Sequence, residues 1–149
     1  MSSSFRYLLS MVGTKGRKRI LLADDHAAML EEAQRLLKED YEIIGAVEDG
    51  GALVEEAQRL RPDVIISDIS MPVMTGFEAA AQIRRSGLTA KLIFLTVQSS
   101  APYLKKARAL GADGYVLKVY CGEQLTVAVS AVLAGRAYVS PELKSYHWK

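Results

Sequence analysis

Polar residues follow four of the short apolar runs in this chain, and their types could do chemistry together. They are three carboxylates, a hydroxyl and an ammonium group: Asp24 and Asp25 after the first run, Asp68 after the third, Thr96 ending the fourth and Lys118 ending the fifth. A single aspartate after a strand is often only a helix N-cap, and a single lysine there is often solvated. The same placement in all of these runs indicates a site instead.

Such a set of side chains is suited to handling a phosphoryl group. Three neighbouring carboxylates repel one another unless a cation intervenes, and oxygen-only ligands favour Mg²⁺, a hard ion commonly shared with phosphate oxygens. An ammonium group and a hydroxyl donor further stabilise an anion. Since the sequence offers no suitable Ser/His or Cys/His pair, a carboxylate is the expected nucleophile, and Asp68 is central to the group. An acyl phosphate on Asp68 would be reactive and reversible, which suits a signal.

The elements that must position these residues alternate along the chain. Continuous apolar runs typical of strands covered on both faces are expected at 20–23, 42–47, 64–67, 92–96 and 115–118. Segments with helical spacing of apolar residues follow them near 29–37, 52–60, 76–87, 102–111 and 122–134. Because parallel strands require crossover connections, these units predict an α/β fold with a parallel sheet between two helical layers. Sites in such sheets form beyond the carboxyl ends of the strands, where the polar residues lie.

Length and composition fit a single globular domain without a membrane span. The chain has 149 residues, 24% of them charged, and a net charge of +2, which gives no reason to expect a polyanionic partner. The basic run at 15–19 is more typical of a solvated terminus than of a nucleic-acid arm. The single Cys121 excludes an intramolecular disulfide and fits a reducing compartment, and no apolar run approaches the roughly 20 residues of a membrane span. We therefore expect a cytoplasmic protein.

Four motifs together resemble the receiver domain of two-component response regulators. They are "LLADDH" (21–26), "VIISDISMPVMTGFEAA" (64–80), "LIFLT" (92–96) and "GADGYVLK" (111–118). The tail "AVLAGRAYVSPEL" makes the chain most similar to LuxR-type (NarL/FixJ) receivers, and the resemblance covers about residues 18–138. It implies a three-layer fold with a five-stranded parallel sheet in the flavodoxin-like order 2-1-3-4-5 and five helices.

The resemblance also implies the chemistry of the acidic residues. Asp68 would accept a phosphoryl group from the phosphohistidine of a sensor histidine kinase or phosphotransfer protein. Asp24, Asp25 and Asp68 would bind Mg²⁺ together with the backbone carbonyl of Ser70. His26 follows the acidic pair, but we do not expect it to be a ligand, because Mg²⁺ prefers oxygen.

Further residues would contact or tune the phosphoryl group. The resemblance implies that Thr96 and Lys118 contact its oxygens, and that Tyr115 is an aromatic switch whose ring turns inward as Thr96 moves. A tyrosine that merely packs is the alternative for Tyr115. Val97 stands where relatives usually carry a smaller residue, so it is expected to narrow access to the site. Ser70 and Gln98 hold the positions that tune phosphoryl lifetime in this family, and neither is an obvious base for hydrolysis.

The last helix has an unusual composition. No charged residue lies between Gln124 and Gly135, so apolar character extends beyond the stripe expected to face the sheet. In receivers, the face made by the fourth helix, fifth strand and fifth helix reads out activation. We therefore expect that face to contact a partner, a second copy in a homodimer or an effector domain, with small residues that need no cover as the alternative.

These features lead to a signalling receiver that is no enzyme beyond promoting its own phosphorylation and dephosphorylation, with an output in transcription regulation. A phosphorylation-independent protein-binding module is the alternative. A phosphohydrolase with an aspartyl nucleophile is disfavoured because Ser70 stands where its second acid would lie.

The expected domain organisation is a flexible N-terminal extension over 1–17, the receiver over 18–138, and a C-terminal tail or linker start over 139–149. No helix-turn-helix pattern lies within 122–149, so we expect this segment to bind no nucleic acid. The chain is either a stand-alone receiver or the receiver part of a longer protein.

Overall fold

The computed structural model of the chain describes residues 16–143. Residues 1–15 of the expected N-terminal extension and residues 144–149 of the expected tail lie outside the described residues. No helix within the described part is both long and apolar enough to cross a bilayer.

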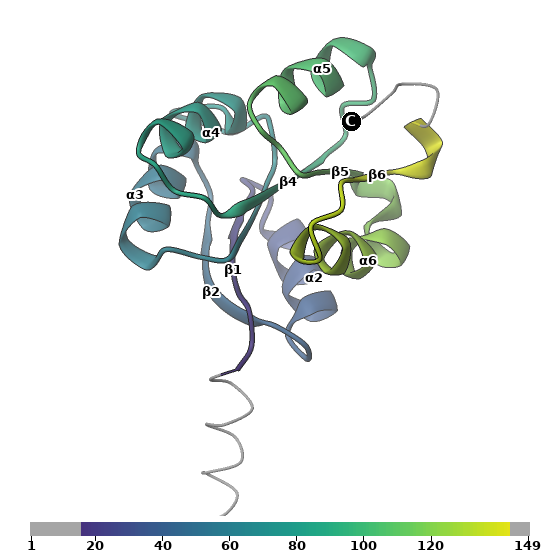
Figure 1. Cartoon of the computed structure of the whole chain (residues 1–149), viewed down its shortest axis with the longest axis horizontal. Coiled ribbons are helices and arrows are strands. Elements are labelled where there is room, and N and C mark those ends of the chain that lie inside the picture. Colours follow the sequence, from purple (N-terminus) through teal and green to yellow (C-terminus); the bar gives the residue numbers. More distant parts are fainter. Residues whose placement is uncertain (1–15, 144–149) are drawn as a thin grey trace, which may run out of the picture.

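Six parallel strands of the described chain form one sheet in the order β2-β1-β3-β4-β5-β6 (Figure 1). The strands are β1 (Arg19–Ala23), β2 (Glu42–Val47), β3 (Val64–Ser67), β4 (Lys91–Thr96), β5 (Gly114–Leu117) and β6 (Tyr138–Val139). The first five have the expected flavodoxin-like order 2-1-3-4-5, so the predicted α/β fold is confirmed. The short β6, which was not predicted, extends the sheet beyond β5, where Tyr138 pairs with Gly114 and Val139 with Tyr115.

Helices cover both faces of this sheet. They are α2 (Ala27–Leu37), α3 (Gly50–Leu60), α4 (Gly76–Arg85), α5 (Ala101–Ala109) and α6 (Cys121–Leu133). Helices α2 and α6 pack on one face, and α3, α4 and α5 pack on the other (Figure 1). Each strand is therefore apolar on both sides: along β3, for example, Ile65 faces the α3–α5 layer and Ile66 faces the α2–α6 layer.

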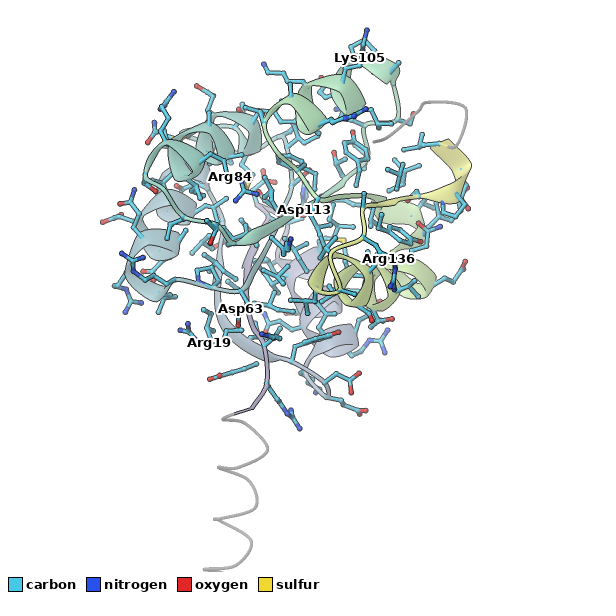
Figure 2. All side chains as sticks on the ribbon, in the orientation of Figure 1. Arg19, Asp63, Arg84, Lys105, Asp113 and Arg136 are labelled. Carbon is cyan, nitrogen blue, oxygen red and sulfur yellow. The ribbon has the colours of Figure 1, made fainter. Side chains whose placement is uncertain are left out.

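Two aspartates join neighbouring strands at the amino ends of the sheet. Asp63, just before β3, accepts the backbone N–H of Arg19 on β1 at 2.8 Å. Asp113, just before β5, likewise accepts the backbone N–H of Leu92 on β4 at 2.9 Å, and its carboxylate lies 3.6 Å from the Arg84 guanidinium. Figure 2 shows both aspartates with these arginines. This edge is held by structural contacts, which leaves the carboxyl ends of the strands for the polar residues singled out above.

The segment after α6 also packs on the core. Ser140 and Leu143 are buried, and a short 3₁₀ helix (Pro141–Leu143) follows β6. The Ser140 hydroxyl accepts the backbone N–H of Leu117 at 2.9 Å and donates to the side-chain oxygen of Gln124 at 2.5 Å. The chain from 139 to 143 is thus tied to the end of β5 and to α6.

Candidate functional site

Lys118 joins two buried carboxylates at the carboxyl edge of the sheet. Its Nζ lies 2.8 Å from Oδ2 of Asp24, after β1, and 2.8 Å from Oδ2 of Asp68, after β3. Asp24 and Asp68 are only 3% and 4% exposed, and the paired carboxylates of neighbouring strands meet here because β1 and β3 are hydrogen-bonded in parallel register. The predicted gathering of Asp24, Asp68 and Lys118 is therefore seen directly.

The carboxylates keep Lys118 charged. Burial of the ammonium group lowers its pKa, but hydrogen bonds to Asp24 and Asp68, together with their negative charges, outweigh that effect, so the pKa of Lys118 is raised above its ordinary value. A fixed positive charge therefore lies against the Asp68 carboxylate. This is the electrostatic environment in which added negative charge on Asp68 is best tolerated.

Asp68 is also held by its own loop. Its Oδ1 accepts the backbone N–H of Ile69 at 2.7 Å, and the N–H of Gly76 donates to the Ile69 carbonyl at 2.7 Å. A Cβ on Gly76 would lie only 2.0 Å from the Asp68 carbonyl oxygen, so this close approach requires glycine. Ser70 follows in the same loop and is exposed. The loop thus fixes the carboxylate while leaving the position two residues after it open to solvent.

Asp25 and His26 complete an acidic cluster at the rim. The His26 ring has Nδ1 at 3.0 Å from Asp24 Oδ1 and at 3.1 Å from Asp25 Oδ1. One ligand atom from each of Asp24, Asp25, His26 and Asp68 lies within 4.8 Å of the others. His26 was not expected in this group from the sequence, yet its imidazole contacts two of the three carboxylates.

Thr96, Gln98 and Tyr115 are linked by two hydrogen bonds on the neighbouring strands. Thr96 is buried at the end of β4, where it pairs with Leu117, the residue before Lys118. Its Oγ1 accepts the backbone N–H of Gln98 at 3.2 Å, and the hydroxyl of Tyr115 donates to the Gln98 carbonyl at 2.7 Å. Gln98, which the sequence indicated only as a tuning position, therefore connects the two expected switch residues through its main chain.

Tyr115 lies inward. Its side chain is fully buried, and burial, followed by the neighbouring Tyr103 and the charge of Asp68, raises the pKa of its phenol well above the ordinary range. The hydroxyl thus stays protonated and remains a donor to the loop that follows β4.

Val97 borders an apolar hollow at the entrance to this cluster. The hollow has a volume of about 400 Å³ and is lined by His26, Ala28, Met29, Val97 and Lys118. Val97 is 71% exposed, and it lines this hollow together with Lys118.

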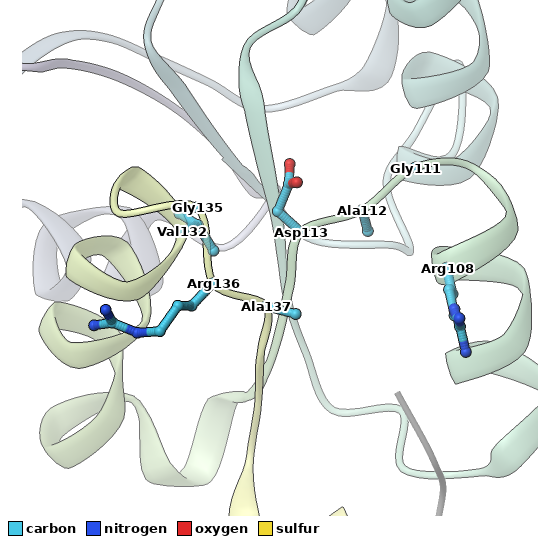
Figure 3. A pocket seen from close by; sticks show the side chains of 8 residues that line it. All are labelled: Arg108, Gly111, Ala112, Asp113, Val132, Gly135, Arg136 and Ala137. Atoms are coloured by element: carbon cyan, nitrogen blue, oxygen red, sulfur yellow. The ribbon is translucent and has the colours of Figure 1, made fainter. Parts of the chain in front are cut away.

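A second hollow, of about 340 Å³, lies at the opposite edge of the sheet (Figure 3). Its charged residues are Arg108, Asp113 and Arg136, and Figure 3 shows their side chains directed away from one another. Asp113 is already engaged by Leu92 and Arg84. The polar groups that line this second hollow do not converge, so the carboxyl edge of the sheet remains the candidate site.

Comparisons with known proteins agree with this geometry. The family model for the response regulator receiver domain matches residues 20–130. Oxygen regulatory protein NreC of Staphylococcus haemolyticus (strain JCSC1435) is 36% identical over 128 residues, which are 84% of this chain and 59% of NreC. The chain thus spans less than two thirds of the length of the first curated relatives that it matches.

Solved structures show the same architecture. A LuxR-family two-component response regulator from Aurantimonas sp. SI85-9A1 is 30% identical, with a TM-score of 0.82 over 87% of this chain and 94% of that one. The isolated REC domain of RcsB from Salmonella enterica serovar Typhimurium, solved in the presence of the phosphomimetic BeF₃⁻, is 25% identical, with a TM-score of 0.80 over 87% and 98%. A further structure holds two RcsB dimers bound to two parallel DNAs, with the same identity and TM-score over 87% and 67%.

The family match and the fold therefore agree with the residues gathered at the carboxyl edge in indicating a receiver domain. Receiver domains are signalling modules and not classical enzymes. This chain belongs to the response regulator receiver domains of two-component systems and is most similar to those of LuxR-type (NarL/FixJ) transcription regulators.

Proposed function

We propose that this receiver takes a phosphoryl group onto Asp68 from a sensor histidine kinase or phosphotransfer protein. The observation that carries this proposal is the half-buried Lys118 ammonium group, 2.8 Å from both Asp24 and Asp68. A purely structural ion pair would need only one of these carboxylates, whereas a phosphoryl site needs a cation beside a nucleophilic carboxylate and a second acidic group for a metal ion.

The donor set fits Mg²⁺. Asp24, Asp25 and Asp68 supply carboxylate oxygens within 4.8 Å of one another, and hard oxygen ligands that leave room for water suit this ion. We assign these three side chains and the backbone carbonyl of Ser70 as its ligands. When bound, Mg²⁺ neutralises charge on the carboxylates and on phosphoryl oxygens.

In the transfer step, a carboxylate oxygen of Asp68 attacks phosphorus and the phosphorus–nitrogen bond of the kinase phosphohistidine breaks. The leaving imidazole retains the bonding electron pair and takes up a proton, while Asp68 becomes an acyl phosphate. Lys118 and the Thr96 hydroxyl contact the phosphoryl oxygens. Hydrolysis later restores the carboxylate, and Val97, Ser70 and Gln98 set how long the phosphoryl group persists.

The conformational change that follows phosphorylation passes from the site through strands β4 and β5. The Thr96 hydroxyl accepts the Gln98 backbone N–H, so movement of Thr96 toward the phosphoryl group displaces the Gln98 main chain. The Gln98 carbonyl accepts the Tyr115 hydroxyl, so this displacement reaches Tyr115. Tyr115 lies on β5, between α5 and α6, so the receiving surface is the α5/β5/α6 face, the fourth-helix, fifth-strand and fifth-helix face of the family. Val127 on the charge-free part of α6 is exposed, consistent with contact to a second copy or an effector domain, and the RcsB relative forms dimers.

The biological role we assign is control of transcription by a cytoplasmic response regulator. We assign residues 18–138 to the receiver, and residues 139–143 pack against it through Ser140 and Leu143. The described segment is not itself assigned a nucleic-acid contact, because its basic residues form no recognition helix.

The test is labelling with a small phosphodonor. Wild-type protein should gain one phosphoryl group in the presence of Mg²⁺ and none when the metal is chelated, and Asp68→Asn should gain none. Asp68→Asn preserves the size of the side chain, and circular dichroism should show that it folds as the wild type does. Failure of folded wild-type protein to label with either a small donor or a kinase would overturn the proposal.

A phosphorylation-independent binding module is a second candidate because of the position of Tyr115. The buried ring already has the inward arrangement implied for an activated receiver. Equal affinity of wild type and Asp68→Asn for a captured partner, with no change on phosphorylation, would favour this candidate. Phosphorylation-dependent affinity would exclude it.

A further inference from the structure

His26 contacts both rim carboxylates that we assign to the metal ion. Its ring Nδ1 lies 3.0 Å from Asp24 Oδ1 and 3.1 Å from Asp25 Oδ1. The His26 backbone N–H donates to the same Asp24 oxygen at 2.9 Å. In the tautomer that carries hydrogen on Nδ1, this N–H points at both carboxylate oxygens, whereas a lone pair there would face two negative charges. The ring is thus a shared hydrogen-bond donor to Asp24 and Asp25.

The same oxygens are needed by Mg²⁺. The ion binds carboxylate oxygens at about 2.0–2.1 Å with strict octahedral geometry. An N–H that points at Asp24 Oδ1 and Asp25 Oδ1 together fills the gap that such an ion would enter. Metal binding through these two oxygens and the His26 contacts to them would therefore exclude each other.

The His26 side chain is able to leave. It is 67% exposed at the N-cap of α2, just before the helix begins at Ala27, so its ring can rotate into solvent without opening the core. Lys118, by contrast, is largely buried and approaches Asp24 through the other oxygen, Oδ2. Lys118 and His26 thus contact different oxygens of the Asp24 carboxylate, and His26 is the more exposed of the two.

We propose that the His26 side chain holds Asp24 and Asp25 together, competes with Mg²⁺ for their oxygens, and is displaced when Mg²⁺ binds. The inference rests on the proposed magnesium-dependent function and adds a residue that sets the metal affinity. His26 is a positioning residue here and never touches the phosphoryl group. Its contacts exist only in the metal-free protein, so they stabilise that state alone and weaken the apparent affinity for Mg²⁺.

The sign of the effect follows from a thermodynamic cycle. His26→Ala removes the donor from the metal-free protein and leaves Asp24 and Asp25 to repel each other, while the metal-bound protein loses nothing. Both consequences favour metal binding. For a partly exposed hydrogen bond to a carboxylate we expect roughly three- to tenfold tighter binding of Mg²⁺.

A matched variant keeps the donor. In His26→Asn the side-chain amide nitrogen occupies the position of Nδ1, two bonds beyond Cβ, so the contact to Asp24 and Asp25 can persist. Its affinity for Mg²⁺ should therefore remain close to that of wild type. A general effect of removing an exposed ring would instead appear in both variants.

The experiment is titration calorimetry of Mg²⁺ into wild type, His26→Ala and His26→Asn, with thermal unfolding of each protein at zero and saturating Mg²⁺. We expect tighter binding only in His26→Ala, and a lower unfolding midpoint for it that disappears when Mg²⁺ saturates. Unchanged affinity in His26→Ala would overturn the inference. Weaker affinity would also overturn it, by showing that the imidazole is a ligand. Absence of Mg²⁺ binding by wild type would instead refute the proposed function itself.

Discussion

The hydroxyl of Ser140 should contribute strongly to stability, because it satisfies two buried groups at once. It accepts the N–H of Leu117 at 2.9 Å and donates to the side-chain oxygen of Gln124 at 2.5 Å, while the residue is fully buried. Ser140→Ala keeps the backbone hydrogen bond from Ser140 to the Tyr115 carbonyl but leaves both of those partners without one. Each buried group left unsatisfied costs about 1–3 kcal/mol.

We expect Ser140→Ala to lose about 2–4 kcal/mol of unfolding free energy, the lower part of the range for two such groups. The Gln124 amide stays held by Glu142 at 2.8 Å, so it cannot turn to find a new partner for its oxygen. The expected loss is a large part of the roughly 5–15 kcal/mol typical of a domain. Urea unfolding followed by circular dichroism should show the midpoint fall by about 1–3 M. Ser130→Ala, an exposed serine on α6, is the control and should stay within about 0.5 kcal/mol of wild type. The same small change for Ser140→Ala would refute the reasoning, and would show that the segment after α6 is not part of the cooperative core.

Two further predictions concern the site. Val97→Ala should speed phosphorylation or loss of the phosphoryl group, measured as labelling and decay rates, because Val97 and Lys118 line the same hollow and a smaller side chain widens it. Two unchanged rates would show that Val97 only packs there. Tyr115 should make the free energy of unfolding fall at alkaline pH. Burial raises the pKa of its phenol in the folded protein above the unfolded value of about 10. The contribution of the protonated phenol to stability is therefore complete below pH about 10 and is lost as pH rises toward the folded pKa. Unfolding free energy measured from pH 8 to 11.5 should therefore decline more steeply for wild type than for Tyr115→Phe, and equal slopes would show that the phenol is not shielded.

The main strands were predictable because each is covered on both faces. Such strands carry uninterrupted apolar runs, as "VIIS" does in β3, and these runs are visible without any tertiary information. The short β6 is different. Tyr138–Val139 is too brief to show a period, and it becomes a strand only because the edge of β5 offers backbone partners to it.

The local backbone conformation of the loop after Asp68 could not be predicted from sequence patterns either. Val73 adopts a left-handed conformation with φ of 70° in the loop after Asp68, although a branched side chain disfavours it. The loop is confined on one side by Gly76, which approaches the Asp68 carbonyl, and on the other by Gly50, where a Cβ would lie 2.1 Å from the Met74 carbonyl oxygen. This strain arises from contacts between distant segments, so the sequence of the loop alone did not predict it.

In the site, the gathering of Asp24, Asp68 and Lys118 followed from strand ends meeting at one edge of a parallel sheet. The contacts of His26 and the main chain of Gln98 did not, because a ring orientation and a loop carbonyl depend on the conformation of connecting segments. A signal for His26 did exist: it stands two residues after Asp24, a spacing at which an aspartate often accepts a backbone N–H. Mg²⁺ preference for oxygen was a sound reason to exclude His26 as a ligand, but it gave no reason to exclude it as a competitor.

The central claim is that Asp68 carries the phosphoryl group, and trapping the acyl phosphate tests it most directly. Protein phosphorylated in the presence of Mg²⁺ is reduced with borohydride, which converts an aspartyl phosphate to homoserine, and the modified residue is located by peptide mass spectrometry. We predict homoserine at position 68 alone, with none formed when the metal is chelated. Homoserine at another aspartate, or a phosphoryl group retained on serine, threonine or histidine with position 68 unmodified, would contradict the account.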